Sequence, residues 1–429
     1  MIQYIKIKNF LSFKDEVVFN FEATKDKKYE DYQVEEIAPG VRILRIAVVY
    51  GANASGKTNL VSAIEFLRNF WFQYLENKDQ PTGAIPFLLA SETPNQPSEF
   101  SIGFYIGQKK YVYNLTVSNN VVLNEKLLIY PSQQPATIYE RVTVDGISQI
   151  TFNPKRVKLG QAAKEQISLY CLQNVSVFAA YNKVNVGAEE MDTVMNWAKA
   201  HFTFQHRMGL EDNVTYTESM ISHNESKKGA ILNFLQRADY NITGIDIQQI
   251  ERAVPDELIP LLIKSSEGVP VSEIERLKRD KTITMNKVDF EHCITNENGE
   301  KEYYKLPKNL QSDGTIRTFG LSGVIDHAVE SNSFITIDEI EDSLHPALIE
   351  FIVEDFLKHK GESQMLVTTH YDGLLEADDL LRNDSIWFTS KKENGATELY
   401  SLVDFKGINR ITSLQKAYRF GQFGAIPNI

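Results

Sequence analysis

A glycine-rich segment followed by a lysine and a threonine is the part of this sequence best suited to chemistry. Residues 51–58, GANASGKT, match the pattern G-x-x-x-x-G-K-[ST] at every specified position. Glycines let such a loop curl so that its N–H groups point at phosphate oxygens, and the following helix adds free donors. Lys57 is expected to reach the β- and γ-phosphates of ATP, and the Thr58 hydroxyl to ligate Mg²⁺. The predicted nucleotide-binding residues are Gly51, Asn53, Ala54, Ser55, Gly56, Lys57, Thr58 and Asn59.

Two adjacent acids follow the apolar run FITI at 334–337. An apolar strand that ends in two acids is costly unless those acids act on a cation or a water molecule. Asp338 is predicted to be the second Mg²⁺ ligand, directly or through water. Glu339 is predicted to orient and deprotonate the attacking water. The alternative is that both acids only cap a turn. The presence of the glycine-rich segment in the same chain makes this alternative less favoured.

Three further residues, His370, Ser312 and Gly314, are candidates for the same site. His370 ends the apolar run MLVTT, and the ends of parallel strands meet at one edge of a sheet, so we expect His370 near Asp338. There it could sense the γ-phosphate or the attacking water; otherwise it is a structural histidine. Ser312 and Gly314 precede a helical pattern, where Ser312 is either an ordinary N-cap or part of an anion-binding helix start.

The predicted elements around these residues belong to the α/β class. Apolar strands alternate with helices of amphipathic spacing, which indicates a mixed or mainly parallel core sheet. Antiparallel hairpins are predicted from shorter alternating runs bounded by turn residues. The predicted strands are 2–8, 16–21, 41–50, 244–253, 281–294, 300–306, 333–346 and 363–375, with hairpins over 99–152. The predicted helices are 58–75, 313–332 and 346–361, with a mainly helical region over 160–240 and a helical insertion over 256–280.

Charge, cysteine content and hydropathy limit the cellular compartment and the classes of partner. The net charge is −12, which argues against a uniformly basic surface that coats nucleic acid. Cys171 and Cys293 are the only cysteines, and they form neither a CxxC pair nor a disulfide framework. No run approaches the roughly 20 apolar residues of a membrane span. We therefore expect a cytoplasmic protein without a membrane partner.

The order of the motifs resembles the ABC-type ATPase heads of the SMC/RecF/OLD group. Within that group it resembles the stand-alone AAA-type ATPases of bacterial anti-phage defence and abortive-infection operons. The resemblance is carried by YIKIKNFLSFKDEVVF, VYGANASGKTNL, SDGTIRTF, IDEIEDSLHP and TTH, and it covers most of 1–180 and 305–429. It implies an N-terminal ATPase lobe with hairpins (1–180), a mainly helical lobe (181–300) and a C-terminal ATPase lobe (301–429).

The resemblance also implies a mechanism. ATP on one subunit would be capped in trans by Ser312 and Gly314 of a second copy, with the loop 341–346 crossing the interface. The homo-oligomer would hydrolyse ATP as the sensor or scaffold of a toxin–antitoxin-like defence system. Its partner would be a separately encoded effector, such as a Toprim-type or other nuclease, and its trigger a phage protein or DNA.

The sequence departs from the group at Leu11 and in the glutamine loop, and it leaves two other functions open. Leu11 stands where the group often has an arginine, with Lys14 as a weak substitute, and no glutamine-loop residue is identifiable. One alternative is a RecF-like DNA-repair ATPase that binds DNA directly. The other is a nucleotide-gated structural assembly in which turnover is incidental.

Overall fold

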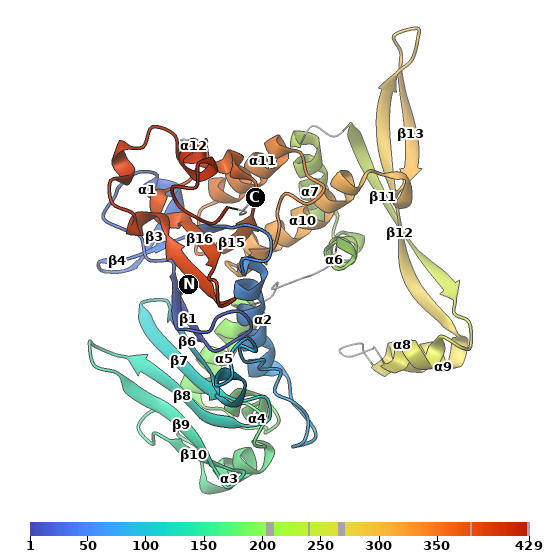
Figure 1. Ribbon diagram of the computed structural model, residues 1–429. Helices are drawn as coiled ribbons and strands as arrows, with labels where there is room; N and C mark the ends of the chain where they lie inside the picture. The colour runs from blue at the N-terminus through green and yellow to red at the C-terminus, as the bar shows by residue number, and fades with distance from the viewer. Residues whose placement is uncertain (203–209, 239–240, 265–270, 378–379, 427–429) are drawn as a thin grey trace. The chain divides into compact units, whose positions relative to one another are not determined.

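The computed structural model describes residues 1–202, 210–238, 241–264, 271–377 and 380–426 (Figure 1). The chain forms two compact units. The first is Met1–Arg207 with His327–Ile429, and the second is Met208–Asp326. The two units are described separately below, and the three-segment division into lobes stays a prediction.

A five-stranded sheet of the first unit carries the candidate site. Its order is β14-β15-β5-β16-β17; the first four strands run parallel, and β17 is antiparallel to β16. Every residue of β5, β14 and β15 is buried, as their continuous apolar runs predicted. The α/β class with a mixed, mainly parallel core sheet is thus confirmed. The bounds are β5 Ile46–Tyr50, β14 Phe334–Ile337, β15 Gln364–Thr369, β16 Ile386–Lys391 and β17 Thr397–Ser401.

A seven-stranded antiparallel sheet forms the hairpin lobe of the same unit. Its order is β10-β9-β8-β7-β6-β1-β2, so the hairpins predicted over 99–152 are confirmed. The predicted strands 2–8 and 16–21 are also confirmed, and they pair with each other in antiparallel fashion. That β1 joins the hairpins through β6 was not predicted. The bounds are β1 Ile2–Lys8, β2 Val17–Asn20, β6 Ser98–Ile106, β7 Lys109–Val117, β8 Val122–Tyr130, β9 Ala136–Val144 and β10 Ile147–Phe152.

Helices pack against both sheets of this unit. In the core, the Trp71 ring of α2 lies 4.9 Å from Tyr113, 5.5 Å from Phe178 and 5.6 Å from Phe202, measured between ring centroids. The helices are α1 Glu30–Gln33, α2 Lys57–Phe72, α3 Gln161–Tyr170, α4 Val177–Tyr181, α5 Glu189–His201, α11 Pro346–Lys358 and α12 Leu414–Arg419. Short 3-10 helices span Thr93–Asn95, Asp372–Leu375, Asn383–Ser385, Leu402–Asp404 and Ile408–Arg410.

The single strand predicted over 41–50 is wrong. The chain forms β4 Val41–Leu44, which pairs with β3 Val34–Ala38, and then β5 in a different sheet. Arg45 separates the two strands. Its fully buried guanidinium donates to the carbonyl oxygens of Tyr32, Leu357 and His359 and to Ser363 Oγ. The break therefore gives the C-terminal carbonyls of α11 a buried cationic donor.

The second unit combines helices with a three-stranded antiparallel sheet, in agreement with the elements predicted there. Figure 1 shows β11 and β12 as a long ribbon with α8 and α9 at one end. A small core includes Val214 and Leu235 from the helices and Phe290 and Phe319, whose rings pack edge to face. The bounds are β11 Ile242–Ala253, β12 Thr282–Thr295, β13 Lys301–Pro307, α6 Leu210–Ser222, α7 Glu225–Arg237, α8 Ile259–Lys264, α9 Val271–Asp280, a 3-10 helix Lys308–Leu310 and α10 Asp313–Glu330. Among the described residues, no helix has the length and apolar character needed to cross a membrane.

We expect Arg45→Met to lower the free energy of unfolding by about 3 kcal/mol, because buried carbonyl groups lose their donor. Urea denaturation measures the change. The exposed Arg410 provides the control, and Arg410→Met should stay within about 0.5 kcal/mol of the original protein. Equal stability of the two variants would contradict the capping role of Arg45.

Candidate active site

Three parallel strands end at one edge of the core sheet and bring the predicted residues together. Tyr50 of β5 pairs with Thr369 of β15, and Val367 of β15 pairs with Ile337 of β14. The next residues along the chain are therefore neighbours at that edge. Thr368 of β15 is bonded directly to the two acids that follow β14. Its hydroxyl donates to Asp338 Oδ1 and accepts from the Glu339 N–H at 2.9 Å.

The glycine loop that follows β5 packs closely against the C-terminal hairpin β16–β17. A Cβ on Gly51 would lie 2.3 Å from Thr389 Oγ1, and one on Gly56 would lie 2.3 Å from Thr397 Oγ1. Gly56 has φ 114° and is the N-cap of α2, without a side-chain hydrogen bond to the helix. Ala54 takes a left-handed φ of 61°. The loop thus needs both glycines and leaves the first-turn donors of α2 without a side-chain cap.

Lys57 is the buried cation of the site. Its residue is 4% exposed, and its Nζ donates to the carbonyl oxygens of Gly51 at 2.7 Å and Ala52 at 3.3 Å. Burial lowers the pKa of Lys57, and the carboxylates of Glu339, Glu341 and Asp338 oppose this shift. The loop lysine and these three acids therefore share one electrostatic environment.

These residues fit a nucleotide phosphate with Mg²⁺. The uncapped start of α2 and the buried Lys57 ammonium both favour an anion. Within the described part of the chain, no group of three His, Cys, Asp or Glu side chains could hold a metal by itself. Mg²⁺ is usually bound by one or two protein oxygens together with phosphate oxygens and water. Thr58, which is half-buried, and Asp338 are the predicted protein ligands.

The two acids after Asp338 have different environments. Glu339 is exposed and has a left-handed φ of 47°, a conformation that a non-glycine residue adopts at a cost. Glu341 Oε1 lies 2.5 Å from His370 Nδ1 and accepts from the His370 N–H at 2.7 Å, and its other oxygen accepts from Thr369 Oγ1. Glu341 thus holds the ring and the backbone of His370. Sequence reasoning missed this residue, although a third acid in DEIED was a visible signal.

The other predicted loop residues have varied settings. Asn53 and Ala54 are exposed, and Ser55 is buried with its hydroxyl 2.6 Å from Thr389 Oγ1. The Asn59 amide donates to Ser12 Oγ at 2.6 Å. Ser12, Thr389 and Thr397 were not predicted, because nothing local in the sequence links them to the loop. The nucleotide contacts of these loop residues stay predictions.

Leu11, where the resembled group often has an arginine, and its neighbours Ser12 and Lys14 contact other parts of the first unit. The Leu11 N–H donates to the Ile85 carbonyl oxygen, and Lys14 forms an ion pair of 2.8 Å with Glu92. Ser12, between them in sequence, is the residue that contacts the loop region. Lys14 is thus already paired, and the adjacent serine supports the glycine loop.

Ser312 and Gly314 belong to the second unit, at the start of α10. The Ser312 hydroxyl accepts from the Thr315 N–H at 3.1 Å and lies 2.8 Å from Thr315 Oγ1. The ordinary N-cap that the sequence allowed is therefore present. Ser312 is exposed and Gly314 half-buried. Their contact with a nucleotide on a second copy stays a prediction.

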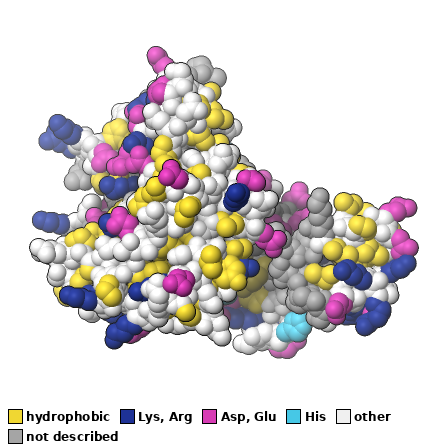
Figure 2. All heavy atoms as spheres, turned by 90° about the horizontal axis from the view of Figure 1, so that it is seen from below, with side chains coloured by type: hydrophobic (Ala, Val, Ile, Leu, Met, Phe, Trp, Pro, Cys, Tyr) yellow, Lys and Arg dark blue, Asp and Glu magenta, His cyan; other side chains and the backbone are white. Residues whose placement is uncertain are grey.

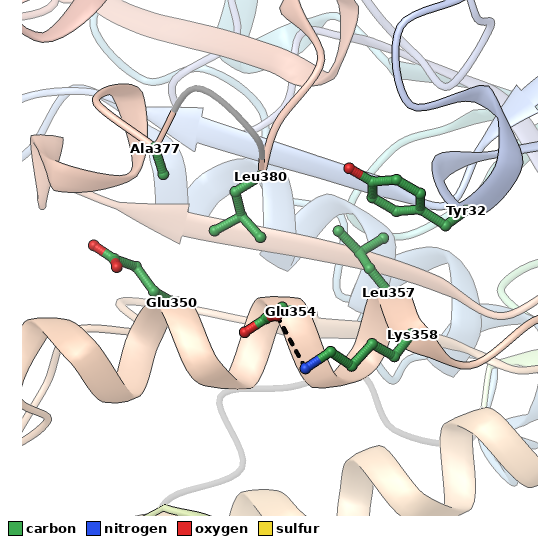
Figure 3. Close-up of a pocket in the computed structure, with 7 residues that line it drawn as sticks. All are labelled: Tyr32, Glu350, Glu354, Leu357, Lys358, Ala377 and Leu380. Carbon is green, nitrogen blue, oxygen red and sulfur yellow. Dashed lines mark ion pairs between the residues drawn. The ribbon is translucent and has the colours of Figure 1, made fainter.

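A separate pocket of about 530 Å³ lies along α11. Figure 3 shows Glu350, Glu354 and Lys358 on this helix, with Tyr32 and Leu380 facing them from other segments. Glu354 and Lys358 form an ion pair of 2.9 Å. None of the predicted site residues lines this pocket.

Comparison with known proteins gives one family match. The model described as "AAA domain, putative AbiEii toxin, Type IV TA system" matches residues 46–158 and 240–376. These ranges include the glycine loop, Ser312, Asp338, Glu339 and His370. No curated protein matches the sequence.

Similar solved structures include two SMC heads. The SMC head domain from Thermotoga maritima is 12% identical over 93% of this chain and 98% of that chain, with a TM-score of 0.42. The Smc head domain with an extended coiled coil, bound to the C-terminal domain of ScpA derived from Pyrococcus furiosus, is 14% identical. It covers 98% of each chain, with a TM-score of 0.38.

We expect Glu341→Gln to lower ATP turnover about tenfold without changing ATP affinity more than about twofold, because His370 loses the carboxylate that holds it. Steady-state kinetics and calorimetric binding give the two quantities. Glu354→Gln, on the pocket wall of α11, is the matched control and should leave both unchanged. A Glu341→Gln variant with normal turnover would remove Glu341 from the site.

Proposed function

Because the chain belongs to the family of AAA domains described as "putative AbiEii toxin, Type IV TA system", we propose that it is an ATPase that binds and hydrolyses Mg-ATP. One observation carries this proposal. The buried Lys57 ammonium lies at the start of an uncapped helix, within the electrostatic influence of Glu339, Glu341 and Asp338 at the same sheet edge. A cation and free helix donors suit phosphates, and an exposed acid beside them suits a water molecule.

Each side chain has a distinct role in this proposal. Lys57 and the first-turn donors of α2 bind the phosphates. Thr58 and Asp338 provide oxygen ligands for Mg²⁺, which neutralises phosphate charge when bound. Glu339 accepts a proton from the attacking water, and His370, held by Glu341, lies at the same sheet edge.

We further propose that ATP joins two copies of the chain. Ser312 and Gly314 of one copy would contact the nucleotide on the other, as the resemblance to ABC-type heads implies. The exposed position of Ser312 and its place at a helix start support a phosphate contact.

The cellular role that we propose is control of a separate effector in anti-phage defence. The family description names a putative toxin of a Type IV toxin–antitoxin system, which supports a role in defence; the separate effector is our own proposal. The groups gathered at the sheet edge are those of nucleotide hydrolysis, so the toxic step, such as nucleic-acid cleavage, is assigned to another protein. The site of action that we propose is the cytoplasm.

Direct DNA binding of the RecF type is the competing function. Figure 2 shows Lys and Arg side chains scattered among acidic ones on the visible face, and the net charge is −12. These features favour a protein partner over DNA. DNA that raises the ATPase rate, with binding that weakens steeply as salt increases, would support the RecF-like role instead.

We expect Glu339→Gln to bind Mg-ATP without turnover and to double in solution mass when Mg-ATP is added. The reason is that the site keeps its cation and donors but loses the acid that activates water. Light scattering coupled to size exclusion measures the mass. Lys57→Ala in the same background should stay at its starting mass.

Two variants of Ser312 separate capping from assembly. Ser312→Arg in the Glu339→Gln background should abolish the mass change but also removes the N-cap of α10. Ser312→Asp keeps a good cap and places a negative charge against a phosphate, so it should also abolish the change while thermal stability stays normal. A mass that doubles in the Asp variant would contradict the contact in trans.

The effector proposal has its own test. We expect the protein, expressed with its neighbouring genes and purified through a tag, to retain one neighbouring gene product, and the Glu339→Gln variant to change the retained amount. Lys57→Ala is the control for nucleotide dependence. Purification of the chain alone under all of these conditions would count against a separate effector.

A further inference from the structure

We propose that Thr397 is a positioning residue for the nucleotide: it sets the direction of the Gly56 N–H that binds phosphate. This inference rests on the ATP-binding function proposed above. Thr397 is the first residue of β17 and lies 342 positions from Ser55, whose carbonyl oxygen it contacts at 2.7 Å. Its side chain also fills the space beside Gly56, where a Cβ would lie 2.3 Å from Oγ1 and 2.7 Å from Cγ2.

The hydrogen bonds around Thr397 connect the start of α2 to the Ser55 carbonyl. Thr397 Oγ1 lies 2.7 Å from Ser55 O and 2.7 Å from Ser12 Oγ, and the Asn59 amide donates to Ser12 Oγ at 2.6 Å. A hydroxyl has a single hydrogen, and a carbonyl oxygen can only accept. Thr397 is the donor toward both acceptors, so its single hydrogen serves either the Ser55 carbonyl oxygen or Ser12 Oγ, and the two contacts together keep Oγ1 beside the Ser55 carbonyl. We call this chain, from Asn59 through Ser12 and Thr397 to the Ser55 carbonyl, the hydroxyl relay.

The relay fixes the orientation of one peptide group. In a planar trans peptide the C=O and the following N–H point in opposite directions. Because Thr397 holds the Ser55 carbonyl toward β17, the Gly56 N–H must point away from β17. In the described part of the chain, that N–H has no hydrogen-bond acceptor. A loop donor held in this way matches what a glycine-rich phosphate loop requires.

Thr389 gives a matched comparison within the same hairpin. It is also fully buried, and it lies 2.3 Å from the position of a Cβ on Gly51. Its hydroxyl lies 2.6 Å from the Ser55 hydroxyl and 3.4 Å from the Tyr50 carbonyl oxygen. Thr389 therefore packs and bonds against the loop but does not hold the Ser55–Gly56 peptide. A general packing role predicts equal effects at the two threonines, and a positioning role predicts an effect at Thr397 alone.

The test is calorimetric binding of Mg-ATP together with steady-state kinetics. We expect Thr397→Val, which keeps the shape and removes the hydroxyl, to raise Kd and KM for ATP about tenfold with kcat within about twofold. Thr389→Val should change Kd by about twofold or less. Thr397→Ser, which restores the hydroxyl, should return Kd to within about twofold of the original value.

A second variant keeps the inference testable if Thr397→Val does not fold. Ser12→Ala removes the hydroxyl that holds Thr397 Oγ1 from the other side, and we expect it to raise Kd about threefold. Added to Thr397→Val it should raise Kd no further, because both act through one carbonyl.

The contradicting outcomes are distinct. Equal Kd for Thr397→Val and the original protein overturns the inference and leaves the proposed function intact. An equal rise in Kd for Thr389→Val and Thr397→Val, or for Ser12→Ala and Thr389→Val, shows that loss of packing around the glycine loop is the cause. That result also overturns the inference. Failure of the original protein to bind Mg-ATP overturns the proposed function and the inference with it.

Discussion

The burial of one ammonium group at the end of β5 is the constraint on which the site depends. A lysine removed from water is unstable as a cation unless nearby groups compensate for the lost hydration. The loop provides two carbonyl oxygens for Lys57, and the sheet edge provides three carboxylates at longer range. Burial still lowers the pKa of Lys57, so this compensation is incomplete. A phosphate, with its negative charge, would complete it.

The acids at the sheet edge have different roles because their backbone conformations and hydrogen-bond partners differ. The turn after β14 has two non-glycine residues in the left-handed region, Glu339 at φ 47° and Ser343 at φ 56°. Such strain is retained only when surrounding contacts determine it. Here the Glu339 N–H bonds Thr368, and the Asp342 N–H bonds the Glu339 carbonyl. Glu339 thus stays exposed to water, whereas Glu341 is committed to His370.

Local sequence patterns were sufficient to predict the core strands and the residues that follow them. The glycine loop, the acids and His370 each end a run of apolar residues, and parallel strands place such ends together. The break at Arg45 could not be predicted, because its partners Leu357 and His359 lie more than 300 positions away. The same distance hides Thr389 and Thr397. The contacts of Ser312 with a nucleotide stay a prediction, because within the chain this residue caps its own helix.

The distant threonines change how the glycine loop is understood. The motif itself supplies flexible backbone, and flexibility alone gives no fixed direction to an N–H group. In this chain, the direction is set by a hairpin near the C-terminus, which is itself held by aromatic packing: the Phe388 ring lies 5.3 Å from Phe423 and 5.8 Å from Tyr418. Tyr50, immediately before the loop, also packs on Tyr418 at 5.8 Å. The strand before the loop and the hairpin that holds the loop thus rest on the same aromatic cluster. Preorganisation of the phosphate donors is therefore a tertiary property, which the motif requires but does not encode.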